Sequence, residues 1–140
     1  CGAALVWNGP VIALMGDLAF AHDVGSLVTA RALNVDLTLV VVDNAGGGIF
    51  DFLAIGSAEP RVLSKYFTTA QPVDVSALAT AAGFEVTRVQ TAGRLLSAIT
   101  FGGQRLVHVQ VPRERNVTQH RAAWAEVARA IDRFKGSEQT

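Results

Sequence analysis

The sequence is poor in several residue types, and each shortage narrows the range of functions. One cysteine in 140 residues excludes an internal disulfide framework and a cysteine-rich zinc site, and fits a reducing cytoplasm. Only 17% of the residues are charged, and twelve Lys and Arg balance twelve Asp and Glu. No basic field therefore points to nucleic acid or an anionic membrane. The longest apolar run, residues 37–42, is too short to cross a bilayer, and no signal peptide is visible.

Apolar residues are abundant instead. Half of the chain is hydrophobic and the mean hydropathy is +0.32, which excludes a disordered chain. The length predicts a single domain over residues 1–140, ending in a polar tail at 136–140. Because such apolarity is unusual for a free-standing small domain, and because the sequence begins without Met, we expect a fragment of a larger multidomain protein.

Strand and helix patterns alternate along the chain. Short apolar runs bounded by turn residues predict buried strands at 11–15, 37–42, 84–89 and 106–111. Helical spacing and capping residues predict helices at 22–34, 75–82, 95–100 and from 116 onward. In the last helix we expect six apolar residues to be buried: Val117, Trp124, Val127, Ala128, Ile131 and Phe134. The alternation predicts an α/β fold, doubly wound, with a mainly parallel sheet flanked by helices.

Two of the predicted strands end in polar residues that burial would not select. Gly16-Asp17 follows the first strand, and Asp43-Asn44 precedes the glycine-rich residues 45–48 after the second. If these strands are neighbours, both side chains emerge at the carboxyl edge of the sheet, where such folds bind ligands. A carboxylate, an amide oxygen and a backbone carbonyl suit Mg²⁺, and loop amides can hold phosphate. The alternative is structural, with a turn at Asp17 and a flexible glycine loop.

Rival motifs are absent from these positions. The first strand is not followed by a G-x-G-x-x-G dinucleotide fingerprint, and residues 46–48 are not followed by the Lys of a P-loop. Residues 56–58 do not form a G-x-S-x-G elbow. The three histidines are scattered, so no zinc site is predicted. His108 lies inside a predicted strand and is interpreted as a satisfied core or interface residue rather than a base.

Gly16-Asp17, followed about 25 residues later by Asp43-Asn44, resembles the thiamine-diphosphate motif, usually GDG and NN. The longer segments GDLAFAHD (16–23) and VVDNAGGGIF (41–50) resemble the C-terminal diphosphate-binding domain of the 2-succinyl-5-enolpyruvyl-6-hydroxy-3-cyclohexene-1-carboxylate (SEPHCHC) synthase family of menaquinone biosynthesis. In that family GDL is common, so Leu18 supports the narrower match. Residues 67–69 and 115–121 also fit, and the resemblance covers nearly the whole chain.

The resemblance implies a thiamine-diphosphate-binding fold truncated at its N-terminus, and a role for each matching residue. Mg²⁺, with Mn²⁺ as an alternative ion, would be held by Asp17, Asn44 and the carbonyl of Gly46. The binding residues for thiamine diphosphate would be Asp17, Leu18, Ala19, Asn44, Gly46, Gly47, Gly48 and Ile49. The apolar substrate pocket would be lined by Ile49, Phe50 and Leu53.

The family enzyme is a transferase, a carboligase that decarboxylates 2-oxoglutarate and adds the succinyl-semialdehyde unit to isochorismate. Its activating glutamate belongs to an N-terminal domain, so the resemblance implies no catalytic residue here and an inactive chain when alone. It also implies a cytoplasmic homodimer or homotetramer, with the missing N-terminal domains as partners and neither nucleic acid nor membrane insertion. The alternatives are another thiamine-diphosphate enzyme, of the 2-oxoacid decarboxylase or acetolactate synthase type, and a non-catalytic binding or assembly module of the same fold.

Overall fold

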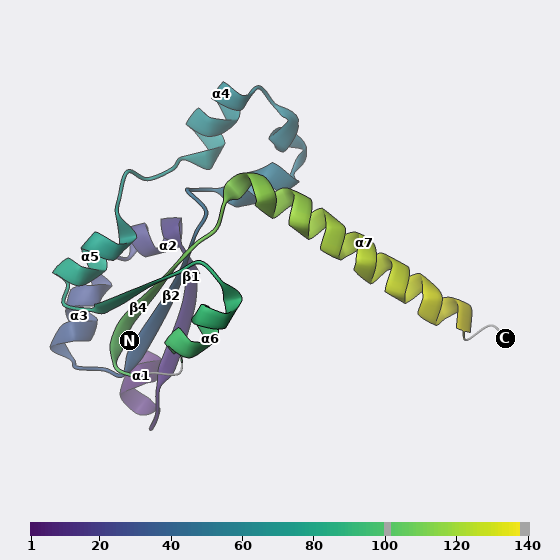
Figure 1. Cartoon of the computed structure of the whole chain (residues 1–140). Coiled ribbons are helices and arrows are strands. Elements are labelled where there is room, and N and C mark those ends of the chain that lie inside the picture. The colour runs from purple at the N-terminus through teal and green to yellow at the C-terminus, as the bar shows by residue number, and fades with distance from the viewer. Residues whose placement is uncertain (100–101, 138–140) are drawn as a thin grey trace.

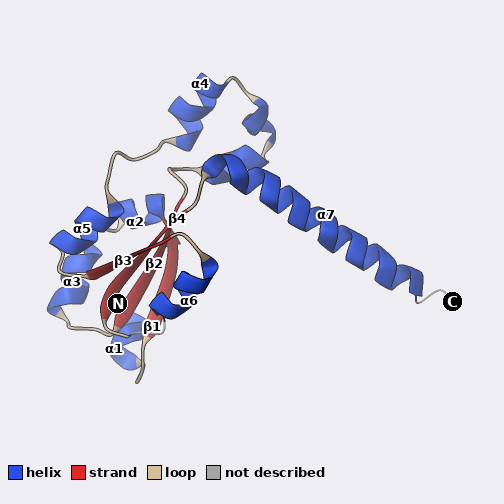
Figure 2. Cartoon of the chain, in the orientation of Figure 1, coloured by secondary structure: helices blue, strands red, loops and turns tan. Residues whose placement is uncertain are grey.

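The computed structural model describes residues 1–99 and 102–137, which form a parallel sheet between helices (Figures 1 and 2). The strands lie in the order β1-β2-β4-β3. Their bounds are β1 Val11–Gly16, β2 Leu37–Asp43, β3 Glu85–Val89 and β4 Gln104–Gln110. The predicted α/β class and parallel pairing are confirmed. In addition, β1 and β2 are neighbours, with Gly16 opposite Val42, so their carboxyl ends meet at one edge.

Helices cover one face of the sheet more fully than the other. The first face carries α2 (Asp17–His22), α3 (Ser26–Ala32) and α5 (Val75–Ala81), whereas α6 (Ala92–Ile99) packs on the second (Figure 1). The other helical segments are α1 (Gly2–Val6), η1 (Gly48–Phe52), η2 (Ala54–Ser57), α4 (Pro60–Leu63), η3 (Ser64–Thr68) and α7 (Arg113–Ser137). Because α6 packs on β3 and β4, it leaves Ile12 and Leu14 of β1 exposed on that face.

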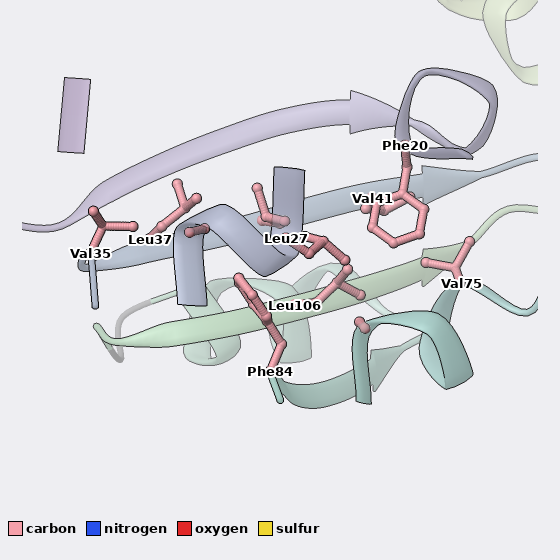
Figure 3. Packing of buried hydrophobic residues seen from close by; sticks show 11 residues of the cluster. Phe20, Leu27, Val35, Leu37, Val41, Val75, Phe84 and Leu106 are labelled. Carbon is pink, nitrogen blue, oxygen red and sulfur yellow. The ribbon is translucent and has the colours of Figure 1, made fainter. Parts of the chain in front are cut away.

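The main core lies between the central strands and the helices of the first face (Figure 3). Phe20 and Leu27 from these helices pack against Val41 and Leu106 of the sheet, and each of the four is at most 2% exposed. A smaller cluster around Val40 lies on the second face beneath α6. Burial on both faces explains why β2 is an almost unbroken apolar run.

The prediction of a first helix over residues 22–34 is wrong at its start. Helix α2 begins at Asp17, immediately after β1, and the chain turns at residues 23–25 before α3. The turn is closed by Ser26, whose hydroxyl donates to the Asp23 carbonyl over 2.8 Å. Side-chain bonds of this kind compete with helix continuation, and the apolar spacing alone did not reveal the break.

The last helix also departs from its prediction. It begins at Arg113 rather than at 116 and runs to Ser137, into the predicted polar tail, whose residues 138–140 lie outside the described part. The prediction that its apolar residues are buried is wrong, because α7 extends away from the sheet (Figure 1). Val117 is half-buried, but five others are exposed: Trp124, Val127, Ala128, Ile131 and Phe134.

Candidate functional site

The carboxyl edge of the sheet brings two predicted metal ligands to neighbouring strand ends. Asp17 opens α2 directly after β1, and Asn44 follows the last residue of β2. Across this edge, the amide of Gly46 donates a hydrogen bond to Oδ2 of Asp17 over 2.7 Å. The two segments that carry the motif therefore touch, in a part-buried position.

Backbone hydrogen bonds hold the loop between Asn44 and η1 in place. The Gly47 amide donates to the carbonyl of Thr68 over 2.6 Å, and the Gly48 amide donates to the carbonyl of Gly46 over 2.7 Å. A carbonyl oxygen has two lone pairs, so Gly46 can accept this bond and still serve a cation. The loop is thus fixed by contacts from two other parts of the chain.

Two glycines are required by this geometry. Gly46 has φ of 111°, and a Cβ there would overlap the carbonyl oxygen of Thr68. A Cβ at Gly48 would overlap the side-chain amide of Asn44. Both glycines are buried, which disfavours the alternative of a merely flexible loop and leaves Asn44 packed against the backbone.

Both carboxylate oxygens of Asp43 have partners within the protein. Its Oδ1 accepts from the Ala45 amide over 3.0 Å, and its Oδ2 lies 2.9 Å from Nε2 of His108. These contacts tie Asp43 to the turn at Ala45 and to β4. The Asp43–His108 pair escaped the sequence analysis, because only the strand order places β4 beside β2.

The other predicted residues surround this loop in different environments. Leu18 and Ala19 lie in the first turn of α2, where backbone amides lack intrahelical acceptors. Ile49 and Leu53 are 67% and 53% exposed, so they form part of an open apolar surface. Phe50 is half-buried, and its ring packs edge-on against Phe67 with centroids 5.4 Å apart.

A cavity of about 630 Å³ opens beside the loop at the ends of β2, β3 and β4. Its described lining is Asp43, Asn44, Ala45, Gln90, Gln110, Val111, Pro112 and Arg113. Arg113 donates to Asp51 over 2.7 Å in a part-buried ion pair that joins α7 to η1. Within the described residues, no group of three or more His, Cys, Asp and Glu side chains could hold a metal.

The donor set at the loop nevertheless fits a hard cation with a phosphorylated ligand. Asp17 offers a carboxylate, Asn44 an amide oxygen and Gly46 a backbone carbonyl, which are the oxygen types that Mg²⁺ takes. Mg²⁺ uses few protein ligands and completes its shell with phosphate and water, so one carboxylate suffices.

An edge of this kind is typical of α/β domains that bind phosphorylated cofactors beyond the carboxyl ends of their strands. Residues 1–111 match the family described as the thiamine pyrophosphate enzyme C-terminal TPP binding domain, and the chain belongs to this family. The resemblance seen in the sequence is thereby confirmed, together with the expected fold.

Two curated relatives show which enzymes the chain is similar to within this family. The chain is 41% identical over 134 residues to the SEPHCHC synthase of Myxococcus xanthus, covering 93% of this chain and 23% of that protein. It is 34% identical to the Listeria monocytogenes synthase, with the same 93% and 23% coverage. The chain therefore spans about a quarter of the length of these relatives.

A solved structure supports the fold independently. A Mycobacterium smegmatis protein, described as a candidate thiamin diphosphate-dependent enzyme, superimposes with a TM-score of 0.51 and 19% identity. The match covers 78% of this chain and 19% of that one. In residues 1–99 and 102–137, none of the helices has the length and apolarity needed to span a membrane.

Proposed function

We propose that this chain is the thiamine-diphosphate-binding and metal-binding part of a SEPHCHC synthase. The observation that carries the proposal is the Asp17–Gly46 hydrogen bond, which joins both motif segments at the carboxyl edge of the sheet. The family match and the names of the curated relatives support the same conclusion.

In this proposal the site residues serve the metal ion, the cofactor and the substrate. Asp17, Asn44 and the Gly46 carbonyl hold Mg²⁺, or Mn²⁺ in its place. The backbone of Leu18, Ala19, Gly47, Gly48 and Ile49 approaches the diphosphate, and the substrate pocket is lined by Ile49, Phe50 and Leu53. When bound, thiamine diphosphate supplies the chemistry for decarboxylation and carbon–carbon bond formation, while these residues bind and orient it.

The proposed parent is a transferase of menaquinone biosynthesis. It takes 2-oxoglutarate and isochorismate as substrates, acts in the cytoplasm as a homodimer or homotetramer, and carries its activating glutamate in N-terminal domains. Exposed apolar side chains support the proposal that other parts cover this chain: Leu14 of β1 is 73% exposed, and Ile131 of α7 is 48% exposed. The chain alone is then a binding domain without turnover.

Calorimetric titration with thiamine diphosphate, with and without Mg²⁺, tests the site. We expect binding that requires Mg²⁺ and that D17A weakens by more than about a hundredfold, because a direct ligand is lost. D23A is the matched control, since Asp23 bonds only its local turn through Ser26 among the contacts described. Equal affinities in D17A and D23A would contradict the assignment.

The synthase assignment needs a different assay. The longer protein proposed here should consume isochorismate only when 2-oxoglutarate is present. Turnover of another 2-oxoacid without isochorismate would favour a decarboxylase or acetolactate synthase type, and cofactor binding without any turnover would favour a binding module.

A further inference from the structure

His108 is a buried polar side chain outside the proposed ligand set. It lies in β4 opposite Val41 of β2 and is 3% exposed. Its Nδ1 lies 2.8 Å from Oγ of Ser76 in α5, and its Nε2 lies 2.9 Å from Oδ2 of Asp43. A ring bonded at both nitrogens in a low-dielectric interior is held in one orientation. The ring therefore links the helix layer to the end of β2.

The direction of these hydrogen bonds follows from Asp43. A carboxylate can only accept, so Nε2–H of His108 donates to Oδ2 of Asp43, which makes a charge-assisted bond. In a neutral ring Nδ1 is then an acceptor, and the hydroxyl of Ser76 donates to it. Oγ of Ser76 keeps a lone pair for Nε–H of Arg88, which donates to it over 2.9 Å.

Asp43 also contacts the metal loop, the name used here for residues 44–47, which contain two of the proposed metal ligands. Its other oxygen accepts from the Ala45 amide over 3.0 Å, where the backbone is left-handed with φ of 60°. The next amide, that of Gly46, is the one that donates to Asp17. Two consecutive loop amides are thus bound by carboxylates, that of Ala45 by Asp43 and that of Gly46 by Asp17.

We propose that His108 is a positioning residue for the metal loop: by holding Asp43, it fixes the turn at Ala45 and directs the Gly46 amide to Asp17. The role in metal binding rests on the proposed function, whereas the effect on the loop does not require a ligand. The effect on the loop and the role in metal binding can therefore be tested separately.

Two amide variants separate the two ring contacts. In H108Q the longer side chain places a nitrogen donor near the position of Nε2, so it keeps the bond to Asp43. In H108N the shorter side chain reaches only the position of Nδ1, so it keeps the Ser76 contact and loses Asp43. S76A is the matched control, because it removes the partner on the far side of the ring.

Amide hydrogen exchange on the full chain without ligand gives the first readout. Relative to Val41, we expect exchange at Ala45 and Gly46 to be about tenfold faster in H108N, the size of one charge-assisted hydrogen bond. In H108Q and S76A the same ratio should stay within about threefold of the unmodified chain. No acceleration in H108N, or equal acceleration in S76A, overturns the proposal.

The unmodified chain provides a readout that does not depend on a buried variant folding. Nitrogen-15 NMR of the imidazole distinguishes a protonated from an unprotonated ring nitrogen. We expect Nε2 to carry the proton and Nδ1 to lack it. A neutral ring with its proton on Nδ1 would set two acceptors against each other at Asp43, and would overturn the proposal.

Titration with Mg²⁺ and thiamine diphosphate separates this inference from the proposed function. If the unmodified chain binds, H108N should bind about tenfold more weakly and H108Q almost as well as the unmodified chain. Unchanged affinity in H108N would overturn the role in metal binding. If the unmodified chain does not bind, the proposed function fails for this chain, and hydrogen exchange still decides whether His108 positions the loop.

Discussion

The carboxylate of Asp17 and the amide of Gly46 lie 2.7 Å apart, although 29 residues separate them in the sequence. The contact is possible because β1 and β2 are adjacent and parallel, so that the chain returns to the same edge after α3. One carboxylate thereby fixes the loop that supplies the other two proposed metal ligands. A change at either side of this bond should disturb the whole set.

The packing of Asn44 against Gly48 gives the first prediction. In G48A the new methyl group would overlap the Asn44 side-chain amide, so that this proposed ligand must move. We expect Mg²⁺-dependent binding of thiamine diphosphate, measured by calorimetry, to weaken by more than about tenfold.

G25A is the control for that variant. A Cβ at Gly25 would meet nothing within 4 Å, and the residue has right-handed helical angles, so G25A should bind as the unmodified chain does. Its free energy of unfolding should change by less than about 1 kcal/mol. Equal affinity in G48A and G25A would show that Asn44 is not a ligand.

The placement of the two proposed ligand side chains at one edge of the sheet could be predicted, because polar residues at the ends of apolar runs stand out. Asp17 and Asn44 were identified in this way, and their common edge follows from parallel pairing. The Asp43–His108 pair could not be predicted, since 65 residues separate the two and β4 rather than β3 lies next to β2. Side-chain pairs across a sheet depend on strand order, which local patterns do not contain.

The last helix shows a second limit of prediction from sequence. Its apolar residues recur at helical spacing, and that periodicity correctly predicts a helix. Periodicity also indicates a face that packs, but it does not say whether the partner lies in the same chain. Here Val127 is 57% exposed, whereas Trp124, earlier in α7, packs with Phe52.

Matched valine substitutions test this exposure. V127A removes methyl groups that are largely in solvent, so the free energy of unfolding should change by less than about 0.5 kcal/mol. V107A removes the same groups from a side chain that is 0% exposed, and should cost about 1–3 kcal/mol. Urea unfolding measures both. A cost for V127A as large as that for V107A would mean that α7 packs against the rest of this chain.

The ion pair between Arg113 and Asp51 should stabilise the start of α7. Their side chains are 21% and 13% exposed, so D51A would leave a poorly solvated guanidinium without this partner. We expect a loss of about 1–3 kcal/mol in the free energy of unfolding. E85A is the comparison. Arg105 is also 21% exposed, but its Nε still donates to the Gly102 carbonyl over 3.1 Å, and Glu85 itself is 64% exposed, so E85A should cost less than about 1 kcal/mol. Similar losses of unfolding free energy in D51A and E85A would contradict the view that burial strengthens the Arg113–Asp51 pair.

The cap of α5 gives a prediction about pH. The Asp74 carboxylate accepts a hydrogen bond from the Ala77 amide over 3.1 Å, and this bond is the main cause that lowers the pKa of Asp74 below 3.8. The Ser76 amide and the positive charge of Arg88 lower this pKa further, and burial opposes them. A carboxyl whose pKa is lower in the folded chain favours folding above its unfolded pKa, and this contribution disappears as the pH falls through the folded value.

D74N separates the charge from the cap, since Asn is as good an N-cap as Asp but does not titrate. We expect the unmodified chain to be more stable than D74N at about pH 6, and the difference in urea midpoint to shrink towards zero well below pH 3.8. Because the cap geometry is common to both chains, the shrinking difference reports the carboxylate alone. A difference that stays constant or grows on acidification would show that the charge of Asp74 does not contribute to holding α5.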